Sequence, residues 1–321
     1  MLVLDVRSAL NYLDEMESIV RIGFTLPQLG ALAHYPREVT RFARQAEQLG
    51  ADSLWVGDRL LAPVNPTVGY GSDGTIPRAF HARLDPFVLL SIAAVSTEHV
   101  QIGTNVLNAP WYPPAVLARS LTSIDLVSGG RLIPGLGVGW SPEEYLAVGV
   151  PMAQRGARLD ECLDALEAYW SDNPVEYHGA YWTIPATYTD LKPAQHPRPP
   201  IYLGGYSPAA MRRAARRADG WLPVVRPGSA AWEFSPAAVN DPVDRLRNMA
   251  TEQGRDPSQL DLILRVYPTA EGTVDQVVDA ITGAEQHTPV EHAFVDLMEI
   301  AEDVDHALEI VNQVLERSRN T

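Results

Sequence analysis

The sequence contains a single cysteine, Cys162, among its 321 residues. One cysteine excludes an intramolecular disulfide framework and any metal site built from several cysteines, which agrees with a reducing cytoplasm. The eight histidines show no His-x-x-x-His pair, so we expect no metal site. Cys162 lies beside the helical stripe of Leu159, Leu163 and Leu166, which predicts a place in the core rather than a nucleophilic role.

Basic residues and long apolar runs are also scarce. The 25 basic and 40 acidic residues give a formal net charge of −15, which opposes binding to nucleic acid or to an anionic membrane. No apolar stretch is long enough to span a bilayer, and the acidic first residues lack the basic start of a secretory signal. We therefore expect a soluble cytoplasmic protein with a small-molecule partner, in which residues 1–20 form an appended helix.

Short apolar runs of strand type alternate with segments of helical period from Ile22 onward. The predicted strands are 22–27, 53–58, 100–107, 131–139, 201–205, 220–225, 260–267 and 292–298, and their helices begin near 36, 86, 113, 154, 208, 236, 274 and 302. Five of these helix starts carry a proline, which suits the first helical turn. Eight such units predict the α/β class and a closed (β/α)8 TIM barrel, with residues 1–321 as one domain.

Three connections are longer than a turn needs, at 59–85, 172–200 and 226–235. Long loops in a domain are commonly lids or binding walls, and we treat 59–85 and 172–200 as insertions. In a barrel, the chain that follows a strand lies on the C-terminal face, where sites are built. The loop 59–85 is therefore predicted to cover a pocket.

The stretch IPGLGVGW places Gly135, Gly137 and Gly139 at every second position. A dinucleotide loop reads G-x-G-x-x-G, so the third glycine comes one position early, and Glu143 and Glu144 in the following helical turn would repel a phosphate. On a strand, a period of two puts the three glycines on one face, where a flat ring can lie against bare backbone. The alternative is that small residues relieve crowding inside the barrel.

A better phosphate site is predicted in LGGYSPAAMRRAARRADG. Gly205 ends a strand, Ser207 is placed to cap the helix that Pro208 starts, and the first turn carries no acid. The four arginines of this helix add positive field, although some must belong to its solvated face. The alternative is an ordinary capped helix that binds nothing.

Asp58 and Arg59 end the second predicted strand, where catalytic residues of barrels lie. They are our candidate catalytic residues, and a structural ion pair between them is the alternative. Asn105 and Asn108 follow the third strand with amides that donate and accept hydrogen bonds, and Trp140 supplies an aromatic wall.

Five motifs in order, SLWVGD, GTNVLNAPWYPPAVLARSL, SGGRLIPGLGVGWSPEEY, GVPMAQRGARLDE and RRADGW, resemble the bacterial luciferase-like flavin and deazaflavin oxidoreductases. The resemblance runs from about Ile22 to about Pro223 and looks closest to the branch that uses coenzyme F420. It implies a barrel holding F420, or alternatively FMN, at its C-terminal face, with a cis peptide at Asn105–Val106 supporting the ring. The cofactor-binding residues that it implies are Asn105, Val106, Asn108, Gly137, Gly139, Trp140, Gly205, Tyr206 and Ser207.

Two departures from this family bear on activity. The sugar-phosphate dehydrogenase branch has histidine after the strand-2 aspartate and an acid at the end of strand 4, where this chain has Arg59 and Trp140. Luciferases also have that histidine, so neither reaction is expected here. The sequence instead predicts a homodimeric oxidoreductase that moves a hydride between F420 and an unknown small organic substrate. An FMN-dependent monooxygenase and a non-catalytic binding barrel are the alternatives.

Overall fold

The computed structural model describes residues 20–70 and 74–320, and its parallel strands form a closed ring. The strands are β1 Arg21–Thr25, β2 Ser53–Val56, β3 Gln101–Thr104, β4 Leu107–Asn108, β5 Leu132–Ile133, β6 Gly135–Gly137, β9 Tyr202–Gly204, β10 Gly220–Leu222, β11 Val224–Val225, β12 Asp261–Val266 and β13 His292–Val295. Strands β3 and β4 share one position in the ring, as do β5 and β6, and β10 and β11. Because β3 pairs with β5, β4 with β6, and β13 with β1, the ring closes and the predicted TIM barrel is confirmed.

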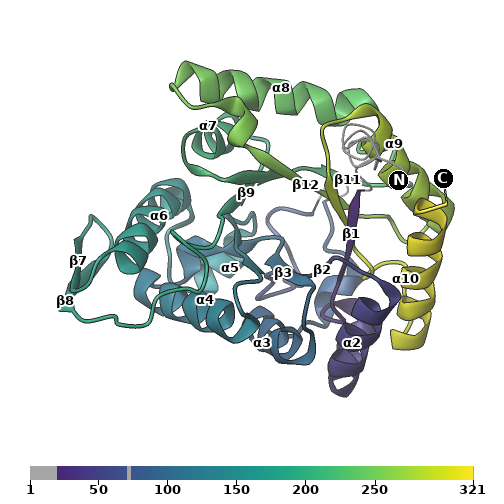
Figure 1. Ribbon diagram of the computed structural model, residues 1–321, viewed down its shortest axis with the longest axis horizontal. Helices are drawn as coiled ribbons and strands as arrows, with labels where there is room; N and C mark the ends of the chain where they lie inside the picture. Colours follow the sequence, from purple (N-terminus) through teal and green to yellow (C-terminus); the bar gives the residue numbers. More distant parts are fainter. Residues whose placement is uncertain (1–19, 71–73, 321) are drawn as a thin grey trace, which may run out of the picture.

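Helices surround this ring (Figure 1). They are α2 Val39–Leu49, α3 Pro86–Ser96, α4 Pro114–Ser128, α6 Arg155–Ser171, α7 Pro208–Arg217, α8 Pro236–Glu252, α9 Val274–His287 and α10 Val304–Ser318. A proline opens α3, α4, α7 and α8, as predicted, because the first helical position needs no N–H donor. Within the described ranges, no helix is long and apolar enough to cross a membrane.

Three strands that the sequence predicted as continuous are interrupted. The strand predicted at 100–107 breaks at the Asn105–Val106 peptide, which is cis, as the resemblance implied. The strands predicted at 131–139 and 220–225 break at Pro134 and Pro223. Proline has no N–H to donate to a neighbouring strand, so the ladder stops there and resumes one residue later.

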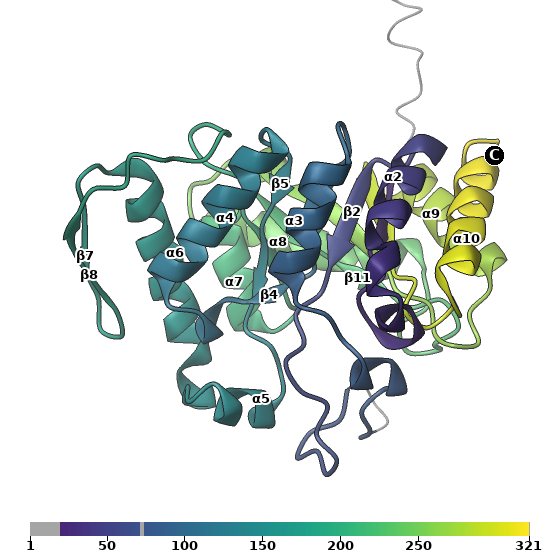
Figure 2. The same cartoon turned by 90° about the horizontal axis from the view of Figure 1, so that it is seen from below.

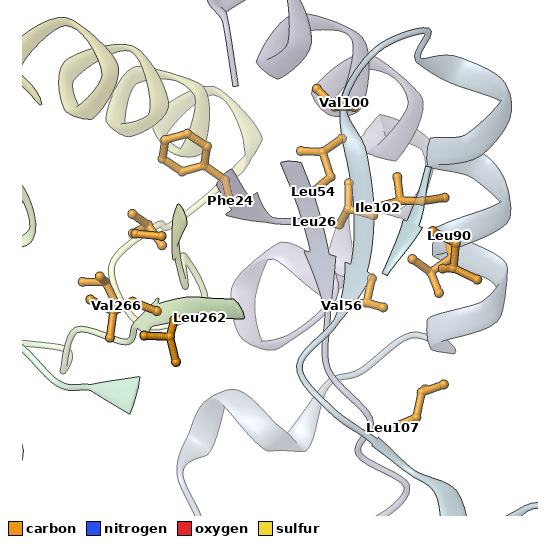
Figure 3. Packing of buried hydrophobic residues seen from close by; sticks show 14 of the residues in the cluster. Phe24, Leu26, Leu54, Val56, Leu90, Val100, Ile102, Leu107, Leu262 and Val266 are labelled. Atoms are coloured by element: carbon orange, nitrogen blue, oxygen red, sulfur yellow. The ribbon is translucent and has the colours of Figure 1, made fainter. Parts of the chain in front are cut away.

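Apolar side chains fill the space on both sides of the barrel wall. Outside it, Leu54 and Ile102 of the strands pack toward Leu90 of α3 (Figure 3). Inside it, a second cluster is centred on Trp55, which stacks on Phe294 with 4.4 Å between ring centroids. This packed interior leaves room for a ligand only toward the C-terminal ends of the strands.

The chain between β2 and α3 and the short helix α5 Pro142–Ala147 project from the same end of the barrel (Figure 2). The insertion 172–200 behaves differently, since it forms an antiparallel hairpin of β7 Val175–His178 and β8 Thr183–Thr187 beside α6. The sequence did not predict this hairpin, and none of its residues lines the cavities described below.

Two further predictions concern Cys162 and residues 1–20. Cys162 is fully buried, and burial raises the pKa of its thiol to about 12, so its core role is confirmed. The appended N-terminal helix predicted for residues 1–20 lies almost entirely outside the described residues, which begin at Val20.

Candidate functional site

Two adjoining cavities lie at the C-terminal ends of the strands. We call them the large cavity, of about 520 Å³, and the small cavity, of about 160 Å³. Six residues line both and so form the boundary between them: Tyr70, Asn105, Val106, Gly139, Trp140 and Arg265. A molecule in one cavity would therefore contact a molecule in the other.

Bare backbone forms one wall of the large cavity. Gly137, Gly139, Gly204 and Gly205 line it around the side chain of Val106. A Cβ added to Gly137 would lie 2.5 Å from Val106 Cγ2, and one added to Gly204 would lie 3.2 Å from Val106 Cγ1. These glycines therefore make room for the Val106 side chain, which follows the cis peptide and projects between β6 and β9.

The prediction that three glycines share one ligand-facing surface is wrong. Gly135 does not line either cavity, and its Cβ would lie 1.9 Å from the carbonyl oxygen of Thr104, so it relieves crowding in the barrel. Gly139 lies beyond the end of β6 and has a φ of 64°, which breaks the alternation of a strand. Of the three glycines in this stretch, only Gly137 and Gly139 line the large cavity.

The predicted phosphate site lies where β9 leads into α7. The Ser207 hydroxyl accepts a hydrogen bond from the Ala210 amide at 3.2 Å, so the predicted cap is present, and the first turn of α7 has no acid. Gly205 and Tyr206 line the large cavity, whereas Ser207 is exposed beside it. The Tyr206 hydroxyl accepts from the Val224 amide at 2.7 Å, which holds its ring against the neighbouring strand.

The arginines of α7 do not simply add positive field. Arg213 pairs with Asp160 at 2.7 Å, and Arg217 pairs with Asp164. Both partners belong to α6, so these two charges are offset on the side of the helix. The attraction for an anion at the start of α7 therefore comes from its dipole.

Asp58 lies in the wall of the small cavity. Its Oδ2 accepts hydrogen bonds from the backbone N–H of Asn108 at 2.8 Å and from the Tyr112 hydroxyl at 3.0 Å. The side-chain Nδ2 of Asn108 donates to the backbone oxygen of Asp58. Burial raises the pKa of the Asp58 carboxyl to about 6. Within the described residues, Oδ1 has no hydrogen-bond partner, and Asp58 lines both the small cavity and a second pocket beside Tyr112.

Arg59 makes no ion pair with Asp58, and its partner is Glu144 of α5 at 3.2 Å. Its guanidinium lies between two rings, 4.5 Å from the centroid of Trp140 and 5.0 Å from that of Phe80. Both ends of the ion pair are buried, with 8% and 0% of the side chains exposed. Arg59 therefore forms part of the wall, and its charge is already balanced.

Glu144 also binds the first residues of the loop 59–85, and the sequence did not predict this contact. Its Oε1 accepts from the amides of Leu60 at 2.8 Å and Leu61 at 3.0 Å. The neighbouring Glu143 accepts from the Thr67 amide at 2.7 Å. The sequence placed both acids in the first turn of a helix, which is correct, but a contact with a loop some eighty residues earlier depends on the closure of the barrel.

The sequence did not predict several other lining residues, among them Gln28, Tyr70, Phe80, Arg265 and Asp296. Gln28 clamps the end of β2 by accepting from the Gly57 amide at 2.6 Å and donating to the Gly57 oxygen at 2.7 Å. Arg265 and Asp296 form an ion pair. Each of these two is a charged residue within or directly after an apolar strand, a pattern that the sequence shows and that marks a buried polar site.

Replacing Tyr112 with phenylalanine should raise the pKa of Asp58 further. The hydroxyl donates to the carboxylate and so stabilises its charged form, which holds the pKa down against the effect of burial. We expect a rise of about one unit, on the scale of one hydrogen bond to a charged group. Carbon-13 NMR of the carboxyl through a pH titration measures this, and an unchanged pKa would show that the hydrogen bond is unimportant.

Charged and polar groups of this site show no metal-binding arrangement. Across residues 20–70 and 74–320, no group of three or more histidine, cysteine, aspartate or glutamate residues is placed to hold a metal ion.

Comparison with known proteins agrees with this architecture. A family model described as luciferase-like monooxygenase matches residues 16–316. An uncharacterized protein of Mycobacterium tuberculosis is 36% identical over 185 residues, covering 56% of this chain and 62% of the relative. The chain thus aligns with less than two thirds of that relative's length.

Solved structures share the fold at low sequence identity. The monooxygenase RslO1 from Streptomyces bottropensis superposes with a TM-score of 0.74 at 19% identity, covering 94% of this chain and 99% of that one. An F420-dependent secondary alcohol dehydrogenase, solved with an F420–acetone adduct, gives a TM-score of 0.71 at 17% identity with the same coverage of both chains. With the family model matching nearly the whole described chain, this protein belongs to the luciferase-like monooxygenase family.

Proposed function

We propose that the protein is an oxidoreductase that moves a hydride between coenzyme F420, bound in the large cavity, and a small organic substrate in the small cavity. The observation that carries this proposal is the pair of adjoining cavities with a shared boundary. One has a glycine-lined wall that leads to the start of α7, and the other contains Asp58. This division suits one molecule with a flat ring and an anionic tail beside a second, smaller molecule.

The residues of the large cavity fit such a cofactor. Gly205 carries no side chain in the wall, so a ring can approach its backbone closely. Asn105 Nδ2 is buried with no hydrogen-bond partner in the described structure, which leaves a donor for a ring carbonyl. The first turn of α7 carries no acid and its dipole favours an anion, which suits a phosphate next to Tyr206.

The protein itself must manage the proton that accompanies hydride transfer. When bound, F420 would supply the acceptor or donor of the hydride. We assign the proton transfer to Asp58, because it lines the small cavity and a pKa of about 6 lets it exist in both forms near neutral pH. Tyr112 and Asn108 hold Oδ2, so the carboxyl keeps one orientation.

The loop 59–85 excludes water from this chemistry. It contributes Arg59, Tyr70 and Phe80 to the small cavity, and the contacts of Glu144 keep its first residues against α5. A covered site strengthens electrostatic interactions and protects a transferring hydride from solvent.

An FMN-dependent monooxygenase is the second candidate, because RslO1 shares this fold and is a monooxygenase. F420 lacks the ring nitrogen that supports the oxygen adduct of reduced flavin, so the identity of the cofactor decides the reaction class. Titration of the protein with F420 and with FMN, each oxidised and reduced, separates the candidates. Submicromolar FMN binding without F420 affinity contradicts the F420 proposal, and binding of neither points to a barrel that binds another ligand.

Replacing Ser207 with aspartate should weaken cofactor binding without harming α7. Aspartate caps a helix as well as serine does, and an added negative charge at this end repels a phosphate. We expect about a tenfold loss of affinity, equal to about 1.4 kcal/mol. Fluorescence titration measures it, with Ser207→Asn as the neutral capping control, and equal affinities of the two variants would remove this end of α7 from the site.

A further inference from the structure

The charges that line the small cavity are balanced in pairs. Four charged side chains reach it: Asp58, Arg59, Arg265 and Asp296. Arg265 donates from Nε to Asp296 Oδ2 at 3.2 Å. Arg59 pairs with Glu144, which does not itself line the cavity. Only 18% of the Arg265 side chain and 8% of the Arg59 side chain are exposed. Neither arginine therefore offers an uncompensated positive charge to an anionic ligand.

Asp58 adds to the barrier against anions. Its carboxyl is either neutral or negative, so the cavity and its paired partners carry a net charge between zero and minus one. An anion entering here would lose its hydration and gain no free cation in return. This argues against the anionic substrate that Arg59 alone would favour.

The aromatic faces that would attract a cation are already occupied by the protein's own cations. Arg59 lies over the rings of Trp140 and Phe80, and Arg265 lies 4.5 Å from the centroid of the Tyr267 ring. The guanidinium groups weaken the attraction of these rings for a ligand cation. Ionised Asp58 would still attract a cation above about pH 6, so the charges of the small cavity oppose anions alone.

The rest of the small cavity has few polar atoms left for a ligand, and the space is small. Leu26, Leu29, Phe80 and Met298 supply apolar lining. The side chains of Thr25, Gln28 and Asn108 also line the cavity, but they already hydrogen-bond to protein backbone. The volume is about 160 Å³, and an apolar protein cavity of about 150 Å³ accommodates one benzene ring. Asp58 and the unpartnered Asn105 Nδ2 remain for a hydroxyl or carbonyl group of the ligand.

We propose that the substrate is a mostly apolar molecule without an anionic group, about the size of one six-membered ring, with a hydroxyl or carbonyl group. This inference rests on the proposed function, in that it assigns the small cavity to the substrate. The charges and the volume of this cavity exclude carboxylates, phosphates and long acyl chains.

Two probes of similar size test the proposal: cyclohexanol and cyclohexanecarboxylate, at about pH 8, where the carboxylate is charged. Their dissociation constants are measured by ligand-observed NMR on the protein alone and on the protein loaded with F420. We expect cyclohexanol to bind at least about tenfold more tightly than the charged probe. Comparable binding of the charged probe, or no binding of either probe in either state, overturns the proposal.

A charge-removing variant sharpens the test. Asp296→Asn keeps the shape of the side chain and leaves Arg265 without its carboxylate, so cyclohexanecarboxylate affinity should rise at least about tenfold. Glu144→Gln should act in the same direction through Arg59 if the first variant folds poorly. Glu143→Gln, which removes a partly exposed charge from the same helix, is the control and should change nothing. No gain of carboxylate affinity in either test variant contradicts charge balance as the cause.

The two proposals fail in different ways. Preference for cyclohexanol in a protein that binds no F420 would contradict the proposed cofactor and leave the assignment of the small cavity standing. Tight F420 binding with preference for the charged probe would overturn the substrate class alone.

Discussion

Asp58→Asn should lower kcat by about 10²- to 10⁴-fold, the range that general acid–base catalysis contributes. Asparagine keeps the shape of the side chain, and its amide oxygen still accepts from Asn108 and Tyr112. What it loses is the ability to exchange a proton at the cavity. Steady-state kinetics with a substrate that the wild-type enzyme accepts, together with F420 affinity, should show lost turnover at nearly unchanged cofactor binding.

The same variant should be more stable than the wild-type protein at neutral pH, although it is less active. The folded pKa of Asp58, about 6, lies above its ordinary value of 3.8, so the folded state binds the proton more tightly than the unfolded chain does. The stability that this group contributes is therefore present below pH 3.8 and is lost as pH rises through about 6, by about 3 kcal/mol. Asp58→Asn removes this pH dependence, which urea unfolding at several pH values measures.

A variant that stays active would remove Asp58 from proton transfer. A variant that loses activity and stability together would show a structural role instead. Only lost turnover with equal or greater stability at neutral pH fits a buried carboxyl that is retained for chemistry.

Periodicity predicted the barrel because each strand–helix unit repeats the same burial requirement. Strands such as 260–267 and 292–298 appear within one to three residues of their predicted bounds. The interruptions at Pro134 and Pro223 carry a visible cause, whereas the break after Thr104 depends on a peptide conformation that composition does not encode. For that break the family resemblance, rather than the pattern, supplied the position.

Some residues of the candidate site could also be predicted from the sequence, and others could not. Residues at strand ends, such as Asp58, Asn105 and Asn108, were predicted because position in a barrel implies proximity to its C-terminal face. Partners from distant segments were not, since the contact of Glu144 with Arg59 and that of Arg265 with Asp296 exist only once the ring has closed. Arg59 is an example, because it follows a strand at a position typical of catalytic residues, yet it contacts Glu144, Trp140 and Phe80 in the cavity wall.

Glu144→Ala should reduce the free energy of unfolding by about 3 to 5 kcal/mol, the usual cost of removing one partner of a buried ion pair. The change leaves the buried guanidinium of Arg59 without its carboxylate and removes the acceptor for the amides of Leu60 and Leu61. Urea unfolding measures the global effect. Hydrogen exchange should show the local one, as faster exchange of those two amides.

Glu143→Ala is the matched control, since it removes the preceding carboxylate of α5. That side chain is partly exposed and accepts from the Thr67 amide and the Ser141 hydroxyl, so its loss should cost less than about 1 kcal/mol. Comparable destabilisation by the two variants would mean that α5, rather than the buried carboxylate, supports the loop. If Glu144→Ala alone speeds exchange at Leu60 and Leu61, one buried carboxylate both balances the charge of Arg59 and keeps the loop 59–85 over the small cavity.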